Sequence, residues 1–265
     1  MKKLTSIAVL LLSATALSSC GEEAFPDITG PMAESRIKFF NFSVGAPGVY
    51  FYANNNKVAG ITGTVVIDAA TGIVTSGAES VTGITYPATS TSDGGVTAGG
   101  YYSAIAPGSY DLAAKLADTT QRATVVSTLS TAIASGKYYS YYLSGAYNTA
   151  TKSAEAFIVE DNFPVNMDWT QAYVRFVNAS PTSAPLSLYA KLQATGVEGR
   201  LGENVAYKTA GAFLSVPTAV YDLTARDANG VTKVTRTAVS FSAGRVYTIT
   251  LRGTTTLALN NTTNR

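Results

Sequence analysis

The chain repeats itself, and this duplication constrains its fold more than any other feature of the sequence. Lys38–Ser43 (KFFNFS) matches Arg175–Ser180 (RFVNAS) at an offset of 175 − 38 = 137 residues. Three further blocks follow in the same order in both halves: Ala46-Pro47 with Ala184-Pro185, Tyr110-Asp111-Leu112 with Tyr221-Asp222-Leu223, and Gly136-Lys137-Tyr138-Tyr139 with Gly244-Arg245-Val246-Tyr247. The shared order of these blocks indicates a tandem duplication.

The duplication predicts two similar domains joined by a linker. Without residues 1–19 the chain has 265 − 19 = 246 residues, which suits two domains of about 100–130 residues. The predicted organisation is a signal peptide (1–19), an acylated tether (20–34), a first repeat (35–160), a linker (161–171), a second repeat (172–255) and a C-terminal tail (256–265). The first repeat also carries an insertion, which includes a Gly/Ser/Thr-rich loop at 88–100.

The composition and the spacing of apolar residues favour β-structure. Short alternating apolar runs are separated by Gly, Pro and Asn, with no long helical period. Strands are predicted at 36–42, 48–53, 63–67, 109–116, 123–129 and 137–143, and then at 172–178, 186–192, 212–216, 220–227, 231–239 and 245–251. This pattern predicts an all-β fold of two tandem β-sandwiches, immunoglobulin-like or transthyretin-like.

Two of the repeated blocks also carry a family resemblance. Val174–Pro181 (VRFVNASP) and Ala243–Thr248 (AGRVYT) show it best, and the first repeat departs from it at Phe42-Ser43-Val44. The two repeats resemble the bacterial domain of unknown function DUF4397. The resemblance implies a secreted or lipid-anchored β-sandwich that often occurs in tandem. It implies no established activity and no catalytic residues.

The only cysteine, Cys20, ends a segment typical of a lipoprotein signal. Lys2 and Lys3 begin this segment, Ile7–Leu12 forms a short apolar stretch, and Ala16–Ser19 supplies the small residues of a cleavage site. The apolar stretch is too short to span a bilayer, which needs about 20 apolar residues. The segment resembles the bacterial lipobox, which implies lipidation of Cys20. We therefore expect a protein of the bacterial envelope, lipid-anchored at the outer membrane, on its periplasmic face or at the cell surface.

The residue types that the chain lacks exclude several functions. The sequence contains no histidine, which excludes Ser-His-Asp and Cys-His catalysis and imidazole zinc sites. Lipidation of the single cysteine leaves no thiol for a disulfide or for a metal. The signal peptide holds two of the 19 basic residues, so the mature chain has 17 of each sign and no surface suited to nucleic acid. We expect no enzyme, no cofactor, no metal site and no nucleic-acid partner.

A difference between the copies suggests candidate ligand-binding residues. Alternation in the last repeated strand places Tyr139, Tyr141 and Leu143 in the core, as it does their counterparts Tyr247, Ile249 and Leu251. On the outward face the first copy has Tyr50, Tyr138 and Tyr142, where the second has Ser187, Val246 and Thr250. Exposed tyrosines suit stacking on sugar rings or burial in a protein interface. The alternative is structural, because tyrosine favours strands and these rings could pack under the loop of the first copy.

These observations lead to two hypotheses about function. The first is a membrane-anchored envelope lipoprotein that acts as a non-catalytic binding module for a glycan or an envelope protein through Tyr50, Tyr138 and Tyr142. The second is a structural or adhesive surface subunit that resembles two-domain pilin-like lipoproteins. In both, the lipid on Cys20 joins the protein to the membrane.

The lipid anchor gives the first testable prediction. Replacing Cys20→Ala removes the only acylation site, so the variant should leave the membrane fraction and partition into the aqueous phase of a detergent separation. Stable anchoring needs more than one acyl chain, each contributing about 0.8 kcal/mol per buried CH₂. Detergent-phase partitioning that persists in the variant would contradict the lipoprotein assignment.

Overall fold

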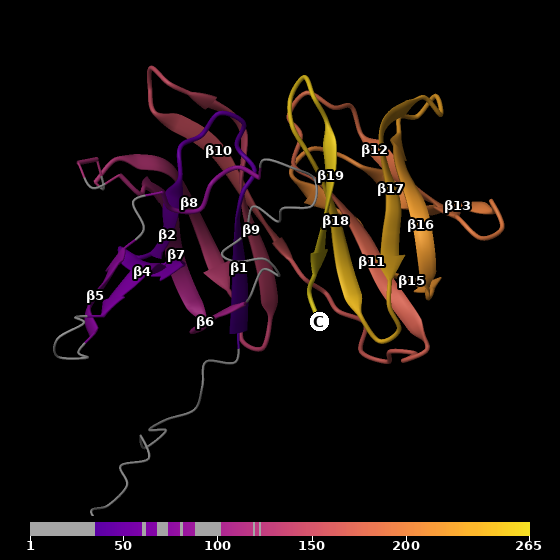
Figure 1. The fold of residues 1–265 in the computed structure, drawn as a ribbon, viewed down its shortest axis with the longest axis horizontal. Helices are drawn as coiled ribbons and strands as arrows, with labels where there is room; N and C mark the ends of the chain where they lie inside the picture. The colour runs from indigo at the N-terminus through magenta and orange to yellow at the C-terminus, as the bar shows by residue number, and fades with distance from the viewer. Residues whose placement is uncertain are drawn as a thin grey trace, which may run out of the picture. The chain divides into compact units, whose positions relative to one another are not determined.

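The computed structural model describes residues 35–59, 62–67, 74–79, 82–87, 102–118, 120–121 and 123–265. Within these ranges every regular element is a β-strand (Figure 1), which confirms the all-β class. No helix in the described part of the chain is long and apolar enough to cross a bilayer. Cys20 and the loop at 88–100 lie outside the described residues, so both stay predictions.

The first repeat forms two four-stranded sheets and a hairpin. The sheets have the orders β10-β9-β1-β6 and β3-β2-β7-β8, and β4 pairs with β5. The strands are β1 (Ser35–Asn41), β2 (Val49–Ala53), β3 (Asn56–Ala59), β4 (Thr62–Ile67), β5 (Val74–Glu79), β6 (Ser103–Ile105), β7 (Gly108–Leu116), β8 (Val125–Ile133), β9 (Tyr138–Asn148) and β10 (Ser153–Glu160).

The second repeat also forms two sheets. One has the order β14-β11-β18-β19, with β15 also paired to β11, and the other has the order β13-β12-β16-β17. The strands are β11 (Gln171–Asn178), β12 (Leu186–Leu192), β13 (Glu198–Val205), β14 (Thr209–Ala210), β15 (Leu214–Pro217), β16 (Ala219–Arg226), β17 (Thr232–Phe241), β18 (Val246–Arg252) and β19 (Ala258–Thr263).

The strand pairings agree with the duplication. In the first repeat β1 pairs in parallel with β9, and in the second β11 pairs in parallel with β18. Both pairs lie side by side in Figure 1, and the named neighbours of each are antiparallel. Because sheets of mixed direction need specific connections, the same mixed pattern in both repeats is strong support for a common origin.

Each repeat encloses its own hydrophobic core. Tyr139, Tyr141 and Leu143 lie in the first core, as predicted. Their counterparts Tyr247, Ile249 and Leu251 lie in the second. Burial of one large apolar side chain contributes roughly 1.5–3 kcal/mol, so these cores can stabilise a chain that has a single cysteine. The two-sandwich architecture is confirmed, whereas the immunoglobulin-like or transthyretin-like comparison stays a prediction.

Every strand predicted from the sequence overlaps an observed strand, but several observed strands were not predicted. The missed strands are β3, β5, β6, β10, β13, β14 and β19. The segment 256–265, expected to be a tail, contains β19, which pairs with β18 along its length. The strand β19 has the sequence ALNNTT, which lacks the apolar alternation used to predict strands from the sequence.

One asparagine of the repeated motif performs the same structural task in each copy. Asn178 donates from Nδ2 to the carbonyl of Val205 at 3.1 Å, and its Oδ1 accepts from the backbone of Ser180 at 2.9 Å. Asn41 likewise donates to Ile84 at 2.9 Å and accepts from Ser43 at 3.3 Å. Both asparagines are fully buried. They tie the end of a central strand to the connecting segment beside it.

We therefore predict that Asn178→Leu destabilises the protein. The leucine has a similar volume but leaves the buried groups of Val205 and Ser180 without partners, and the free energy of unfolding should fall by about 2–4 kcal/mol. Urea denaturation would measure the loss. The exposed Asn166 is the control, since Asn166→Leu should change stability by less than about 0.5 kcal/mol. Equal stability of the two variants would contradict the structural role of Asn178.

Candidate functional site

Tyr142 is buried, so the expectation that it is exposed was wrong. Its ring is 1% exposed and stacks on Phe40 at 5.0 Å and on Phe157 at 4.9 Å between ring centroids. Val177 and Ala179 of the second repeat belong to the same cluster. The side chain points away from the core of its own repeat, as alternation predicted, but the second repeat covers that face.

Tyr50 is also buried, which corrects the second of the three expectations. It is 1% exposed, and Lys57 from β3 places its Nζ 4.9 Å from the centroid of the tyrosine ring. The apolar stem of a lysine can cover an aromatic face while its ammonium group stays near water. Neither Tyr50 nor Tyr142 therefore offers an exposed ring to a ligand.

Tyr138 is the candidate tyrosine that lines a pocket. The pocket has a volume of about 480 Å³ and lies where β9 begins and β10 ends. Phe163 provides a second ring, at 5.2 Å from Tyr138 and inclined by 70°. Tyr102 packs nearly perpendicular to Tyr138, with 5.1 Å between the ring centroids. Tyr138 is partly exposed, so the pocket combines accessible aromatic surface with rings that are held in place.

Charged side chains surround these rings. Arg265, which follows the last strand of the second repeat, places its guanidinium 4.8 Å from the ring centroid of Tyr138 and 4.3 Å from that of Phe163. Lys137 and Glu160 form an ion pair of 2.8 Å at the pocket wall. No carboxylate among the described residues pairs with Arg265. The pocket is therefore built by both repeats, and its charged lining balances Lys137 and Arg265 against Glu160 and Asp161.

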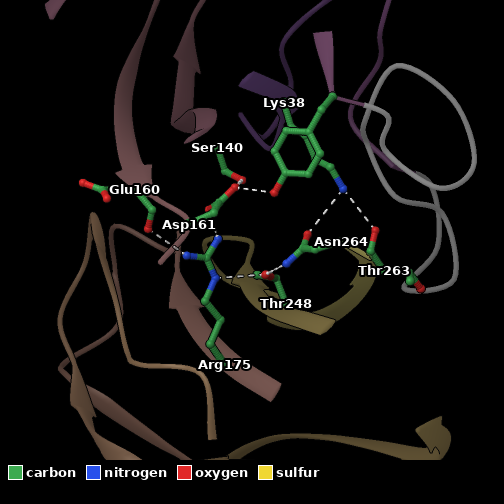
Figure 2. Close-up of polar contacts among 9 residues, drawn as sticks. Lys38, Ser140, Glu160, Asp161, Arg175, Thr248, Thr263 and Asn264 are labelled. Carbon is green, nitrogen blue, oxygen red and sulfur yellow. Dashed lines mark hydrogen bonds and ion pairs between the residues drawn. The ribbon is translucent and has the colours of Figure 1, made fainter. Parts of the chain in front are cut away.

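A buried ion pair lies behind the pocket. The guanidinium of Arg175, on β11, donates to the carboxylate of Asp161 and to the carbonyl of Glu160 at 3.1 Å (Figure 2). Its Nε also donates to Thr248 at 3.0 Å. The side chains of Arg175 and Asp161 are 1% and 0% exposed. Because each charge has lost its water, the pair depends on these partners.

The remaining partners of Asp161 come from the first repeat. Tyr102 donates its hydroxyl to Oδ2 at 2.6 Å, and Ser140 donates to the same atom at 2.8 Å. Burial, and then the neighbouring Asp161 carboxylate, raise the pKa of Tyr102 far above its usual value. Burial lowers the pKa of Arg175, but the attraction of Asp161 and nearby tyrosines outweighs this and leaves it raised. Arg175 and Tyr102 therefore remain protonated, and Asp161 is held as a structural acceptor.

Sequence reasoning missed most of this site. Phe163 and Asp161 lie in the segment predicted to be a linker, and Arg265 lies in the segment predicted to be a tail. One signal was available for Arg175, because the repeat alignment places a basic residue, Lys38, at the same position of the first copy. The aspartates of the other repeated block also have structural partners: Asp111 accepts from Ser130 at 2.5 Å, and Asp222 from Gln193 at 2.7 Å.

Described residues of the first repeat also line pockets elsewhere. One of about 370 Å³ is lined by Asn54, Tyr110, Asp111 and Ser130, and its polar groups largely bond one another. Another of about 480 Å³ lies beside Asp118 and Tyr147. In the described ranges no group of three or more His, Cys, Asp or Glu side chains could hold a metal ion.

Comparisons with known proteins identify the repeats. The family model DUF4397, a domain of unknown function, matches residues 35–189 and again residues 172–264. The C-terminal domain of AlgF from P. aeruginosa is 18% identical, and the match covers 36% of this chain and 99% of that chain with a TM-score of 0.26. A "putative cell adhesion protein" from Bacteroides ovatus is 9% identical over 89% of this chain and 97% of that chain, also with a TM-score of 0.26. No curated protein matches the sequence.

The buried pair behind the pocket gives a stability prediction. Asp161→Ala leaves the Arg175 charge without its partner, which should lower the free energy of unfolding by about 3–5 kcal/mol. Adding Arg175→Met should recover much of the loss, because it removes the unpaired charge. The neighbouring Glu160→Ala is the control: its ion pair with Lys137 is partly exposed and should contribute less than about 1 kcal/mol. Equal losses for Asp161→Ala and Glu160→Ala in urea would refute this account.

Proposed function

The chain belongs to the DUF4397 family, and from that premise we propose that it is a lipid-anchored binding module of the bacterial envelope. It binds a glycan or an envelope protein and catalyses no reaction. The pocket around Tyr138 is the site that we propose for this ligand, and the observation that carries the proposal is the partly exposed pair of rings, Tyr138 and Phe163, beneath Arg265.

The comparison of the two copies supports this choice of pocket. The strand β1 pairs with β9 in the same register in which β11 pairs with β18. In this register Tyr138 on β9 corresponds to Val246 on β18. A valine in a strand cannot offer a flat face to a sugar ring or to a planar side chain. The first copy therefore has an aromatic group at the position where the second has none, and this group lies at an accessible pocket.

The chemistry of the pocket suits recognition more than catalysis. Aromatic rings supply apolar contact, and Lys137, Glu160 and Arg265 supply directional polar groups at the rim. The nearest buried carboxylate, Asp161, already accepts bonds from Arg175, Tyr102 and Ser140. A carboxylate held in this way has no free position from which to take a proton from a substrate.

The proposed location rests on the sequence before the first strand. The lipobox ending at Cys20 supports acylation, and residues 20–34 would separate the lipid from β1. A module anchored in this way meets ligands confined to the envelope, so a moderate affinity suffices because the anchor raises the local concentration.

The test replaces the ring of the pocket by its counterpart from the second copy. Tyr138→Val should weaken ligand binding about 30-fold, since an aromatic anchor commonly contributes about 2 kcal/mol or more to binding. A glycan array and an envelope pull-down, each performed with wild type and variant, would identify ligands whose binding depends on the Tyr138 ring. Titration calorimetry would then measure the change in affinity.

Tyr189→Val is the matched control. Tyr189 lies on β12 of the second repeat and also carries a guanidinium over its ring, that of Arg226 at 4.4 Å. This variant should bind every ligand as wild type does. If Tyr138→Val and Tyr189→Val retain all ligands equally, the pocket at Tyr138 is not the binding site.

A further inference from the structure

The contact between the repeats is reciprocal. Arg175 of the second repeat donates to the carbonyl of Glu160, at the end of β10, at 3.1 Å. Lys38 of the first repeat donates to the carbonyl of Thr263, at the end of β19, at 3.0 Å (Figure 2). Glu160 pairs with Tyr139 and Thr263 pairs with the equivalent Tyr247, so the two acceptors occupy the same position of each repeat.

The side chains around these two bonds correspond as well. Lys38 donates to Oδ1 of Asn264 at 3.4 Å, as Arg175 donates to Asp161. Each acceptor directly follows the residue whose carbonyl accepts from the same cation. Ser140 bonds Asp161 at 2.8 Å, and its counterpart Thr248 bonds Asn264 at 2.6 Å. Two polar clusters therefore have the same construction, one facing each way, and they meet at Thr248, which also accepts from Arg175.

Aromatic rings complete both networks. Lys38 lies 4.3 Å from the ring centroid of Tyr102, and Arg175 lies 4.6 Å from that of Phe213. Tyr102 directly precedes β6, and Phe213 directly precedes β15. These strands take equivalent places beside β1 and β11, so the two rings are also counterparts.

A second pair of reciprocal bonds lies toward the opposite ends of β9 and β18. Tyr207 of the second repeat shares a hydrogen bond of 2.9 Å with Ser144, the residue after Leu143. Tyr86 of the first repeat accepts from Arg252, the residue after Leu251. When residue i of one unit meets j of the other and j meets i, the interface has two-fold symmetry, as in a homodimer.

The apolar centre of the contact breaks this symmetry. The first repeat contributes the large rings of Phe40 and Phe42, and the second contributes Val177 and Ala179 at the equivalent positions. Two first-repeat faces would therefore overfill the contact, and two second-repeat faces would leave a void, each of which is destabilising. The face of each repeat consequently fits the face of the other repeat better than it would fit a copy of itself.

We propose that this face, the outer surface of β1-β9-β10 and of β11-β18-β19, also docks the complementary repeat of a second copy of this chain. The segment 162–170 joins the docked residue Asp161 to β11, and extended it spans roughly 30 Å. Two chains can therefore exchange repeats, with the first repeat of each docked on the second repeat of the other. The exchanged dimer uses the same contacts as the closed chain.

Complementary charge reversals test this proposal. Asp161→Arg places a second cation beside Arg175, and Arg175→Glu places a second carboxylate beside Asp161, so each variant alone should open. In a 1:1 mixture, an exchanged dimer pairs the unchanged Asp161 of one chain with the unchanged Arg175 of the other. Its second contact brings the introduced arginine and the introduced glutamate together, so both contacts join opposite charges.

We expect the mixture to form a species of twice the chain mass by light scattering, with each variant alone monomeric. All chains also carry Cys20→Ala so that acyl groups cause no association. The double variant Asp161→Arg/Arg175→Glu is the matched control, because its opposite charges restore the pair within one chain and should give a closed monomer.

Two results would overturn the proposal. A mixture that stays monomeric, while the double variant recovers the melting temperature of wild type, would confine the face to contacts within one chain. Loss of the β-sheet circular dichroism signal in either single variant would show that the pair holds the sandwiches themselves and not their docking.

Discussion

The contact between the two repeats determines which surfaces of this protein remain available, and the buried Asp161–Arg175 pair is its most demanding interaction. Taking both charges out of water costs several kcal/mol per ion, which the fold offsets with the carbonyl of Glu160 and the hydroxyls of Tyr102 and Ser140. A hydrophobic pair could stabilise the contact equally well. The ion pair adds selectivity, because only one alignment of the repeats brings all of these partners together.

Duplication explains why this contact has a symmetric frame and an asymmetric centre. A two-fold contact between identical domains requires each residue to suit its own counterpart. Once the domains are joined in one chain, each can change alone, and here the first copy has large rings such as Tyr142 while the second has small residues such as Ala179. This division of volume disfavours the pairing of like copies and so makes the contact specific.

Alternation in the sequence predicted the faces of the strands but not what covers them. Tyr141 and Leu143 were placed in the core correctly, because period-two patterning is a local property of a strand. The same pattern turned Tyr142 outward correctly, yet exposure depends on the rest of the fold, and the second repeat buries this ring. Phe163 and Arg265 could not be found in this way, because they belong to segments without apolar alternation that meet only when the repeats pack.

The pocket and the docking face are consequently coupled. Tyr138 and Phe163 come from one side of the repeat contact and Arg265 from the other, so Arg265 completes the pocket only when a first and a second repeat are docked. A ligand that bridges the rings and Arg265 would stabilise the docked state by the same free energy by which docking strengthens ligand binding, because coupling free energies are reciprocal. Binding at this site would therefore hold the repeats together, in a closed chain or between exchanged ones. Ligand binding as proposed would thus link recognition to assembly without a separate regulatory element.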